Sequence, residues 1–479
     1  MFNPSSVAVI GATNALGKWG FDLMWGLLRS RNRRKIYPVN VTESEVHGIK
    51  SYPRVTDIPE PIDLALIVVP AAHVVAVMKD CVDKGVKAAI VITAGFAELG
   101  EEGMKIQKEL VDVARSGGIR FIGPNTMGHF STASGFNSVT TLEDVGEKGS
   151  IGLISQSGNI GIYNVMRGLE DGVSFSKFIG TGNEADVTLE DCLEYLGQDK
   201  DTKVIALYVE GLRKGRRFLE LAREITRKKP IVALKVGRTE AGTKAARSHT
   251  SALSGSDRVY DAAFKQCGVI RVDELAELFG TAVALSRQPM MRGNRVGIVT
   301  RGGGFGVLAS DACQARGLAV PALSQHTMDQ LNRLLPPYWS HGNPVDMVAS
   351  NAYAYPCIKA MMDDDIIDAV YYLSVIDFNP RFTMDKLAYV PPANQGEAQR
   401  MIEEYNRQEV DGMAAVAKGV SEYHKPIIFC AVTPSRKLWT SEVYFKLREN
   451  NALVYPVPED GAKILAHLAQ YGKYRGEWK

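Results

Sequence analysis

Ile151-Gly152-Leu153-Ile154-Ser155-Gln156-Ser157-Gly158-Asn159-Ile160-Gly161 is an apolar run that ends in small and polar residues, and the same pattern recurs without a gap at Val296-Gly297-Ile298-Val299-Thr300-Arg301-Gly302-Gly303-Gly304-Phe305-Gly306. Each copy predicts a buried strand, a tight turn and the start of a helix. Small residues let backbone N–H groups approach an anion, and a helix N-terminus adds partial positive charge. The repeat predicts two similar domains, each with a phosphate site; the alternative is two ordinary strand-to-helix turns that bind nothing.

Short apolar runs alternate with amphipathic stretches along all 479 residues. This alternation is typical of parallel strands joined by crossover helices, and the length corresponds to roughly three domains of ~150 residues. We therefore expect an α/β protein with three doubly wound domains, over residues 1–128, 129–290 and 294–479. Residues 378–407 fit the alternation poorly, and we expect an insertion or a covering segment there.

The charge balance, with 56 Lys and Arg residues against 54 Asp and Glu residues, leaves the chain almost neutral. Proteins that bind nucleic acid or anionic membranes usually carry a basic excess, so we expect neither partner. The six cysteines have no paired spacing, which predicts neither a zinc site nor disulfides and indicates a reducing cytoplasm. We find no export signal and no apolar run of about 18 residues, so we expect no membrane span.

The first apolar run, at residues 7–10, leads into a glycine-containing turn at residues 11–20. A helix is predicted next, which is the setting in which parallel sheets bind a nucleotide diphosphate. The turn is not a clean G-x-G-x-x-G, and the second strand ends at Asn40 instead of at an acid, with Glu43 and Glu45 slightly later. The pattern disfavours a nicotinamide dinucleotide without excluding it. It favours another ligand that contains ADP, with coenzyme A as the first candidate.

Three further predicted strands of this domain end in small or polar residues, at Val69-Pro70, Ile92-Thr93-Ala94 and Gly123-Pro124-Asn125. The carboxyl ends of parallel strands share one edge of the sheet, where open α/β sheets bind ligands. We therefore expect a crevice for an extended ligand along this edge.

A basic cluster follows the first predicted helix and consists of Arg29, Arg31, Arg33, Arg34 and Lys35. One interpretation places it near the additional phosphate of coenzyme A. The other is that it complements the C-terminal end of the helix and faces solvent.

Residues 245–256 are mostly small or polar and include His249, which predicts a mobile loop. A neutral imidazole nitrogen attacks phosphorus near pH 7 and the N–P bond is easily broken, so a histidine can carry a phosphoryl group transiently. The alternative is a lone histidine on a polar surface loop. Residues 181–186 and Glu210 each follow a predicted strand. The Glu210 carboxylate can accept the Nδ1 proton of His249 and leave Nε2 as nucleophile, unless it only caps the next helix.

This set of motifs resembles the NDP-forming acyl-CoA synthetase superfamily, which includes succinyl-CoA synthetase and the α subunit of ADP-forming acetyl-CoA synthetase. The resemblance spans nearly the whole chain, and the order and spacing of the motifs make it specific. It rests on the turn at Gly11, Ile36-Tyr37-Pro38-Val39-Asn40, Val69-Pro70, Ile92-Thr93-Ala94-Gly95-Phe96, Gly123-Pro124-Asn125, Ser155-Gln156-Ser157-Gly158, Gly182-Asn183-Glu184-Ala185-Asp186, Ser248-His249-Thr250 and Gly342-Asn343-Pro344-Val345-Asp346.

The resemblance implies a Rossmann-like CoA-binding domain over 1–128, a flavodoxin-like ligase domain over 129–290 and a second flavodoxin-like domain over 294–479. His249 would be the phosphorylated residue on a swinging loop, and Glu210 its supporting glutamate. The CoA-binding positions are Gly11, Ala12, Thr13, Asn14, Leu16, Val39, Asn40, Val69, Pro70, Ile92, Thr93 and Ala94. The phosphate- or acyl-binding positions are Asn125, Gln156, Ser157, Gly158, Asn159, Gly303 and Gly304.

An enzyme of this kind interconverts acyl-CoA, phosphate and ADP with a small carboxylic acid, CoA and ATP, through an acyl phosphate and a phosphohistidine. The three domains leave no room for an ATP-grasp module, so the resemblance implies an ATP-grasp β subunit that binds ATP or ADP with Mg, in a cytoplasmic hetero-oligomer. Arg301 stands where relatives often have alanine, and Thr126-Met127 replaces the Cys-Pro of succinyl-CoA synthetases, which disfavours succinate. The alternatives are a non-catalytic CoA-binding regulatory or assembly subunit and, from the first turn alone, an NAD(P)-dependent oxidoreductase.

Overall fold

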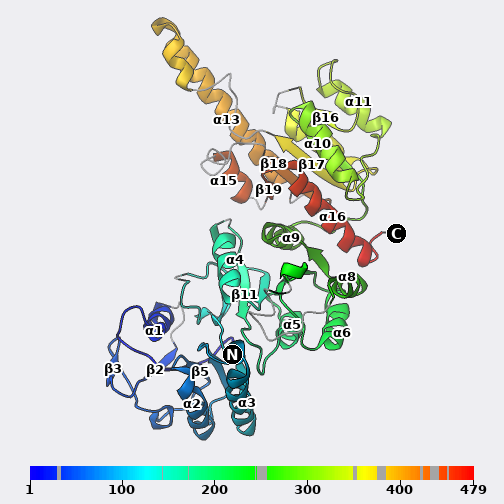
Figure 1. Cartoon of the computed structure of the whole chain (residues 1–479). Coiled ribbons are helices and arrows are strands. Elements are labelled where there is room, and N and C mark those ends of the chain that lie inside the picture. The colour runs from blue at the N-terminus through cyan, green and yellow to red at the C-terminus, as the bar shows by residue number, and fades with distance from the viewer. Residues whose placement is uncertain are drawn as a thin grey trace. The chain divides into compact units, whose positions relative to one another are not determined.

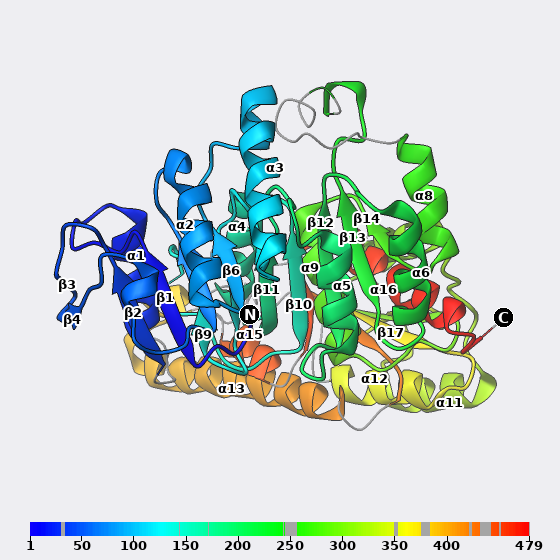
Figure 2. The same ribbon diagram turned by 90° about the horizontal axis from the view of Figure 1, so that it is seen from below.

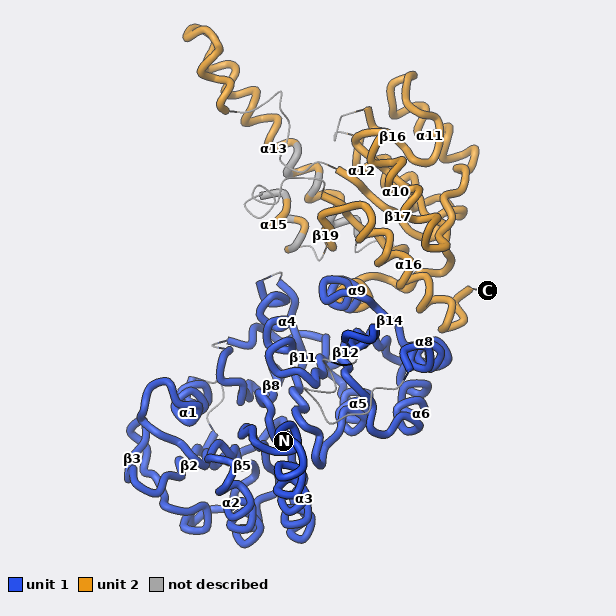
Figure 3. The backbone as a smooth tube through the Cα atoms, viewed as in Figure 1, with its two compact units in different colours: residues 1–282 blue, residues 283–479 orange. Residues whose placement is uncertain are grey.

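A computed structural model describes residues 1–29, 34–142, 144–170, 172–242, 244, 256–348, 353–374, 384–420, 424–431, 442–449 and 452–478. The chain divides into two compact units, unit 1 over Met1–Ala282 and unit 2 over Val283–Lys479 (Figure 3). Among the described residues, unit 1 contains two large sheets and a short hairpin, and unit 2 contains one large sheet.

The first sheet of unit 1 is parallel and has the strand order β2-β1-β5-β6-β7. Its strands are β1 (Ser6–Ile10), β2 (Lys35–Val39), β5 (Leu64–Ile67), β6 (Ala88–Val91) and β7 (Arg120–Ile122). Its helices are α1 (Trp19–Arg29), α2 (Ala71–Lys84) and α3 (Glu101–Ser116), and its connections carry η1 (Val55–Asp57), η2 (Ala97–Leu99) and the hairpin of β3 (Glu45–Val46) and β4 (Ile49–Lys50).

Both faces of this sheet are apolar because helices cover both. Val7 and Val9 pack with Leu23 of α1, whereas Ala8 and Ile10 belong to the core that α2 and α3 complete. Successive side chains of a strand point to opposite faces, so an uninterrupted apolar run is required here. Figure 2 shows α2 and α3 side by side in front of the strands.

The second sheet of unit 1 has the strand order β14-β13-β12-β10-β11-β8-β9. Its strands are β8 (His129–Ser131), β9 (Phe136–Asn137), β10 (Ile151–Ser155), β11 (Phe175–Gly180), β12 (Val204–Val209), β13 (Ile231–Lys235) and β14 (Ile270–Val272). The associated helices are α4 (Gly158–Glu170), α5 (Leu189–Gln198), α6 (Gly215–Ile225), α8 (Asp257–Gln266) and α9 (Leu275–Arg287). The sheet is parallel except that β8 pairs antiparallel with β11 and with β9. These two short strands were not predicted from the sequence.

The helices of the second sheet also form two layers. Leu193, Phe218 and Phe264, from α5, α6 and α8, pack on one face of the strands. Helix α4 approaches the other face closely, because a Cβ on Gly161 would lie 2.7 Å from the ring of Phe178. The glycine shared by both copies of the internal repeat therefore has a packing role.

Unit 2 has a parallel sheet of strand order β16-β15-β17-β18-β19. Its strands are β15 (Val296–Thr300), β16 (Val345–Asp346), β17 (Ala369–Ser374), β18 (Ile427–Ala431) and β19 (Val454–Tyr455). Its helices are α10 (Gly303–Gln314), α11 (Gln325–Leu334), α12 (Ala354–Asp363), α13 (Gln395–Val420), α15 (Glu442–Glu449) and α16 (Pro458–Tyr474), with the turns η4 (Met384–Tyr389) and η5 (Pro392–Asn394). The expected α/β class with doubly wound parallel sheets is confirmed.

The segment that was expected to be an insertion contributes to helix α13, which is 26 residues long. Its described part, from residue 384 on, forms η4, η5 and the N-terminal half of α13, which projects beyond the sheet of unit 2 in Figure 1. Ile402 in the first half of the helix is buried, and Val416 in its second half enters the core of unit 2. A strand-and-helix alternation could not accommodate a helix of this length.

Candidate functional site

In each of the three large sheets, one of the turns that were predicted to bind a ligand lies at the point where the strand order reverses. Strand β1 lies between β2 and β5, β10 between β12 and β11, and β15 between β16 and β17. Successive connections therefore leave these strands to opposite sides, and open α/β sheets usually bind their ligands at the carboxyl ends of such strands. The turns singled out from the sequence at Gly11, Ser157 and Gly303 follow these three strands.

Two glycines shape the turn after β1. Gly11 has a φ of 98°, a left-handed conformation that favours glycine. A Cβ on Gly20 of α1 would lie 1.9 Å from the carbonyl oxygen of Gly11, so only glycine lets the helix approach the turn this closely. The side chain of Leu16, 83% exposed, lies in the same turn and is accessible to a ligand.

The turn after β1 is hydrogen-bonded to Glu43, one of the two acidic residues that were noted shortly after the second predicted strand. Glu43 accepts hydrogen bonds from Thr13 Oγ1 at 2.5 Å and from the Asn14 backbone N–H at 2.9 Å. Asn40 supports the same turn by donating from Nδ2 to the Ala12 carbonyl at 2.7 Å. These hydrogen bonds lower the pKa of Glu43, with the bond from Thr13 as the largest cause. The backbone N–H of Asn14, which is suited to an anionic ligand, therefore already donates to the Glu43 carboxylate.

The remaining predicted CoA residues lie at the same carboxyl edge, but they differ in accessibility. Val39 and Ile92 are 3% and 7% exposed and belong to the apolar core, so only their backbone can meet a ligand. Thr93 donates from Oγ1 to the Val69 carbonyl at 2.7 Å. Among the predicted CoA residues that lie beyond the turn after β1, the exposed ones are Pro70 and Ala94.

The loop at residues 182–186 joins the two sheets of unit 1 next to this edge. Asn183 donates from Nδ2 to Glu98 and Gln107 at 2.5 and 3.1 Å, and its Oδ1 accepts from Asn125 at 3.3 Å. Glu98 in turn accepts the Gly95 N–H at 2.6 Å. Asn125, predicted to bind phosphate or acyl groups, is thus held at the junction between the expected CoA crevice and the second sheet.

The turn after β10 contains the start of helix α4. The first N–H groups of a helix have no partner inside it, so the N–H groups of Ser157, Gly158 and Asn159 are suited to an anion. A Cβ on Gly158 would lie 2.4 Å from Cγ of Met127. Close packing against Met127 is therefore one reason for a glycine at this position, beside the approach of an anion to the backbone.

Gln156 differs from its neighbours because its side chain bonds to protein groups. Its Oε1 accepts the backbone N–H groups of Glu210 and Gly211 at 2.5 and 3.0 Å. Its Nε2 donates to Glu184 Oε1 at 2.9 Å and to the Gly211 carbonyl at 2.7 Å. The structure therefore brings Gln156 and Glu210 together, across the ends of the adjacent strands β10 and β12.

Glu184 is a functional candidate that the sequence analysis mentioned only as part of a motif. Its side chain is buried, and it accepts from Thr181 Oγ1 at 2.9 Å as well as from Gln156. Burial raises the pKa of the Glu184 carboxyl to about 7, against the opposing effect of these hydrogen bonds. Its signal in the sequence is weak, since the partner Gln156 is 28 positions away.

His249 lies outside the described residues, as do its neighbours at 245–255. The described ends of this segment are β13, whose Lys235 is followed by Val236 bonded to the Val209 carbonyl at 3.0 Å, and α8, which begins at Asp257. Strand β13 is paired with β12, the strand that Glu210 follows. The assignment of His249 stays a prediction.

In unit 2, the turn after β15 has room for a ligand. A Cβ on Gly304 would meet nothing within 4 Å, and one on Gly303 would lie 3.2 Å from the Asp346 carboxylate. Arg301, the residue that departs from the family pattern, donates from Nη2 to the Tyr405 hydroxyl at 3.1 Å. The Gly303 turn thus resembles the Ser157 turn of unit 1 in its position after a central strand.

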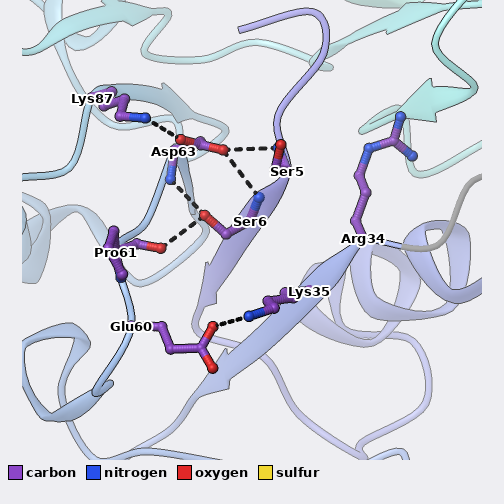
Figure 4. Close-up of a pocket in the computed structure, with 8 residues that line it drawn as sticks. All are labelled: Ser5, Ser6, Arg34, Lys35, Glu60, Pro61, Asp63 and Lys87. Carbon is purple, nitrogen blue, oxygen red and sulfur yellow. Dashed lines mark hydrogen bonds and ion pairs between the residues drawn. The ribbon is translucent and has the colours of Figure 1, made fainter.

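Figure 4 shows a pocket at the amino ends of β1 and β2, opposite to the predicted CoA edge of the same sheet. It is lined by Ser5, Ser6, Arg34, Lys35, Glu60, Pro61, Asp63 and Lys87. Lys87 pairs with Asp63 at 2.6 Å and Lys35 pairs with Glu60, whereas Arg34 donates to backbone carbonyls such as that of Pro4. It contains none of the predicted site residues, and we assign it no ligand.

The basic cluster is divided by this arrangement. Strand β2 begins at Lys35, which pairs with Glu60, and Arg34 donates from Nε to the Pro4 carbonyl at 3.2 Å. Arg34 and Lys35 thus lie at the opposite edge of the sheet from the predicted CoA residues, because the start of a strand lies at the opposite edge from its end, and this position does not favour a contact with a CoA phosphate. Arg31 and Arg33 lie outside the described residues.

The described residues contain no group of His, Cys, Asp and Glu side chains that could hold a metal ion. Within the described ranges, no helix combines the length and apolar character that a bilayer crossing requires.

Three family models match successive parts of the chain: a CoA binding domain at residues 5–131, a succinyl-CoA ligase like flavodoxin domain at 148–285 and a ligase-CoA domain at 296–389. The α subunit of ADP-forming acetate–CoA ligase II from Pyrococcus furiosus is 40% identical over 478 residues, which cover 99% of this chain and 98% of that protein. The chain belongs to the NDP-forming acyl-CoA synthetase family.

Two further relatives agree with this assignment. ADP-forming acetate–CoA ligase II from Archaeoglobus fulgidus is 39% identical over 99% of this chain, which spans 67% of that longer protein. The structure of acetyl-coenzyme A synthetase 1 from Ca. Korarchaeum cryptofilum, solved in complex with phosphate and ADP, matches with a TM-score of 0.87 and 31% identity over 99% of this chain and 97% of that chain. The family and the ligase class expected from the sequence are confirmed, while the roles of single residues stay predictions.

Proposed function

We propose that this NDP-forming acyl-CoA synthetase chain acts as an α subunit that interconverts acyl-CoA, phosphate and ADP with a small carboxylic acid, CoA and ATP. The observation that carries the proposal is the direct bond between the turn after β10, at Gln156, and the backbone of Glu210. This bond supports the proposal because it links a helix start that is suited to an anion to the residue whose carboxylate is expected to support the histidine. The full-length match to a relative named as an α subunit supports the same conclusion.

Coenzyme A would bind along the carboxyl edge of the first sheet. Gly11 would let a ligand approach the backbone of the turn, and Gly20 lets α1 pack closely against that turn. Leu16 offers an exposed apolar side chain. The match of residues 5–131 to a CoA binding domain supports this placement. The residues proposed for it are Gly11, Ala12, Thr13, Asn14, Leu16, Val39, Asn40, Val69, Pro70, Ile92, Thr93 and Ala94.

Phosphate and the acyl group would bind at the turns of the other two sheets. Asn125 lies between the CoA edge and the second sheet, where its Nδ2 bonds Asn183. The N–H groups at the start of α4 and at the glycine turn after β15 are suited to the charge of a phosphate. The residues proposed for this role are Asn125, Gln156, Ser157, Gly158, Asn159, Gly303 and Gly304.

The reaction would proceed in three transfers. A phosphate oxygen attacks the thioester carbon, the C–S bond breaks, and CoA leaves as a thiolate that takes up a proton. Nε2 of His249 then attacks phosphorus, the bond to the acyl oxygen breaks, and the carboxylate leaves. Finally a terminal oxygen of ADP attacks the phosphorus, the N–P bond breaks, and ATP is released. Positioning and anion stabilisation would provide most of the rate enhancement, as is usual in phosphoryl transfer.

Glu210 would hold the imidazole of His249 in the reactive tautomer by accepting the Nδ1 proton. Its carboxylate would then stabilise the positive charge of the phosphorylated ring. The side chain of Glu210 is 8% exposed, so this charge interaction would be screened little by solvent.

The nucleotide half of the reaction is assigned to a separate ATP-grasp β subunit, which would bind ADP or ATP with Mg²⁺ in a cytoplasmic hetero-oligomer. Mg²⁺ would neutralise the charge of the nucleotide phosphates. The Archaeoglobus fulgidus relative supports a second component, since this chain spans 67% of that polypeptide. We also propose three domains, over 1–128, 129–290 and 294–479, in agreement with the three successive family matches.

The proposed function is tested by ATP formation from acetyl-CoA and other short acyl-CoA esters, with phosphate and ADP. The chain and its ATP-grasp subunit are assayed separately and after co-expression. We expect ATP only from the complex, with equimolar release of CoA. Tight CoA binding without turnover by the complex would instead indicate a regulatory or assembly subunit.

A further inference from the structure

Three buried glutamates lie beyond the strand ends of the second sheet, and only one of them has an expected role. Glu184, Glu190 and Glu210 are 4%, 0% and 8% exposed. Glu190, in α5, accepts the N–H of Lys214 at 2.9 Å, the residue that precedes α6. Glu184 instead contacts the turn expected to bind phosphate, through the side chain of Gln156. Burial of a carboxylate costs folding free energy unless the group is hydrogen-bonded. The contact of Glu184 with Gln156 reduces this cost, and it also links Glu184 to the expected phosphate turn.

The orientation of the Gln156 amide is fixed by its partners. Two backbone N–H donors, from Glu210 and Gly211, point at one atom, which must therefore be the oxygen. The nitrogen then uses its two hydrogens for Glu184 Oε1 and the Gly211 carbonyl. All four hydrogen-bonding positions of the amide are occupied, and Glu184 provides the only one of these partners that lies outside residues 210 and 211.

Glu184 is itself anchored from several sides. Thr181 at the end of β11 donates to the same Oε1 at 2.9 Å, and Arg213 Nε lies 3.6 Å from Oε2. The backbone of Glu184 has a φ of 55°, and the N–H groups of Asn183 and Ala185 donate to the carbonyls of Pro124 and Gly123 at 2.9 and 3.1 Å. The loop thus places the carboxylate between the ends of β11, β10 and β12.

We propose that Glu184 is a positioning residue for the phosphoryl step, which it serves by holding Gln156 so that the Glu210 backbone and the phosphate turn keep a fixed separation. This inference rests on the proposed function. Glu184 touches no substrate in this account. It acts through Gln156 on the place where the acyl phosphate and the histidine would meet, and it has no part in the exchange between histidine and nucleotide.

The difference between the two phosphoryl donors provides the test. Acyl phosphate would phosphorylate His249 at the turn of this chain, whereas ATP would do so at the partner subunit. Phosphohistidine formation is therefore measured in the complex with the ATP-grasp subunit, from labelled acetyl phosphate and separately from labelled ATP. The variants are Glu184→Ala, Glu184→Gln and, as a matched buried control, Glu190→Ala.

We expect Glu184→Ala to slow labelling from acetyl phosphate by about 10- to 100-fold, the effect of a misplacement near 1 Å, and to leave labelling from ATP within about 3-fold of the wild-type rate. Glu184→Gln should restore most of the rate, because its amide oxygen can still accept from Gln156 and Thr181. Glu190→Ala should slow both donors equally or neither.

Each contrary result has a separate meaning. If Glu184→Ala lowers both labelling rates by the same factor, or behaves as Glu190→Ala does at equal thermal stability, the positioning role is refuted while the proposed function stands. If the wild-type complex gains no acid-labile label from either donor, the proposed function itself fails. Failure of Glu184→Gln to recover the rate would also contradict the inference, because the acceptor it retains is the feature invoked.

Discussion

Gly158 and Met127 are in such close contact that a Cβ on Gly158 would lie 2.4 Å from Cγ of the methionine. The contact joins the first turn of α4 to the chain that leaves the first sheet after β7. Two explanations for the glycine therefore compete, close packing against Met127 and close approach of a phosphate to the backbone.

The variants Gly158→Ala and Gly158→Ala/Met127→Ala separate these explanations. We expect the single variant to lose about 1–3 kcal/mol of unfolding free energy, because the added methyl overfills a packed contact. The double variant makes room for the methyl and should recover much of this loss, as measured by chemical denaturation. Gly215→Ala, where a Cβ would meet nothing within 4 Å, is the matched control. If the double variant is no more stable than the single one, packing against Met127 is not the reason for the glycine.

The hydrogen bond between Glu43 and the turn after β1 leads to a prediction about the affinity for CoA. Its carboxylate accepts the Asn14 N–H that a diphosphate would otherwise meet. Glu43→Gln removes the negative charge and should tighten CoA binding by a factor of about two to five, the usual size of an exposed charge interaction. The dissociation constant is measured by calorimetry at low and high salt, and the gain should shrink at high salt. Glu45→Gln is the control for general charge effects, and weaker CoA binding by Glu43→Gln would show that Glu43 instead helps to bind the ligand.

The buried ring of His129 should make the folded protein less stable in acid. The ring is fully buried between Phe2 and Phe136, and burial lowers its pKa from 6.5 to about 3. Between these two values the unfolded chain binds the proton and the native one does not, so stability falls as the pH decreases through this range. The slope from this one group approaches about 1.4 kcal/mol per pH unit.

The variant His129→Gln removes this group while an amide N–H can still reach the Met1 carbonyl, which lies 3.3 Å from Nε2 in the native protein. Unfolding free energies are measured between pH 7 and pH 4. We expect the variant to lose stability less steeply than the wild type as the pH falls. His73→Gln, on the exposed side of α2, is the control for replacing a histidine elsewhere in the chain. Parallel slopes for the wild type and His129→Gln would contradict the assignment.

The strands could be predicted from the sequence because parallel strands are covered on both faces and so form unbroken apolar runs. The first apolar run, at residues 7–10, lies within β1 and differs from it by one residue. Strands β8 and β9 were missed because they are short and include polar residues such as His129 and Asn137. Their pairing with β11 depends on long-range contacts that no local pattern reveals.

The site was predictable to the level of strand ends, and no further. Position after a central strand was enough to place Gly11, Ser157 and Gly303 at switch points. Proximity in sequence was misleading for Lys35, since the start of a strand lies at the edge opposite to its end. The hydrogen bond from Gln156 to Glu184 could not be predicted because it joins loops that follow two different strands. The contact of Glu43 with Asn14 could not be predicted because the loop of Glu43 folds back over the first turn.

The central claim is that His249 carries a phosphoryl group between an acyl phosphate and a nucleotide. It is tested most directly by incubating the complex of this chain and its ATP-grasp subunit with ATP labelled at the γ-phosphate, and by locating the label after peptide digestion. We predict label on the peptide that contains His249, lost in acid and stable in alkali, and absent from His249→Ala. Label that persists in His249→Ala, or that is stable in acid, would contradict the account.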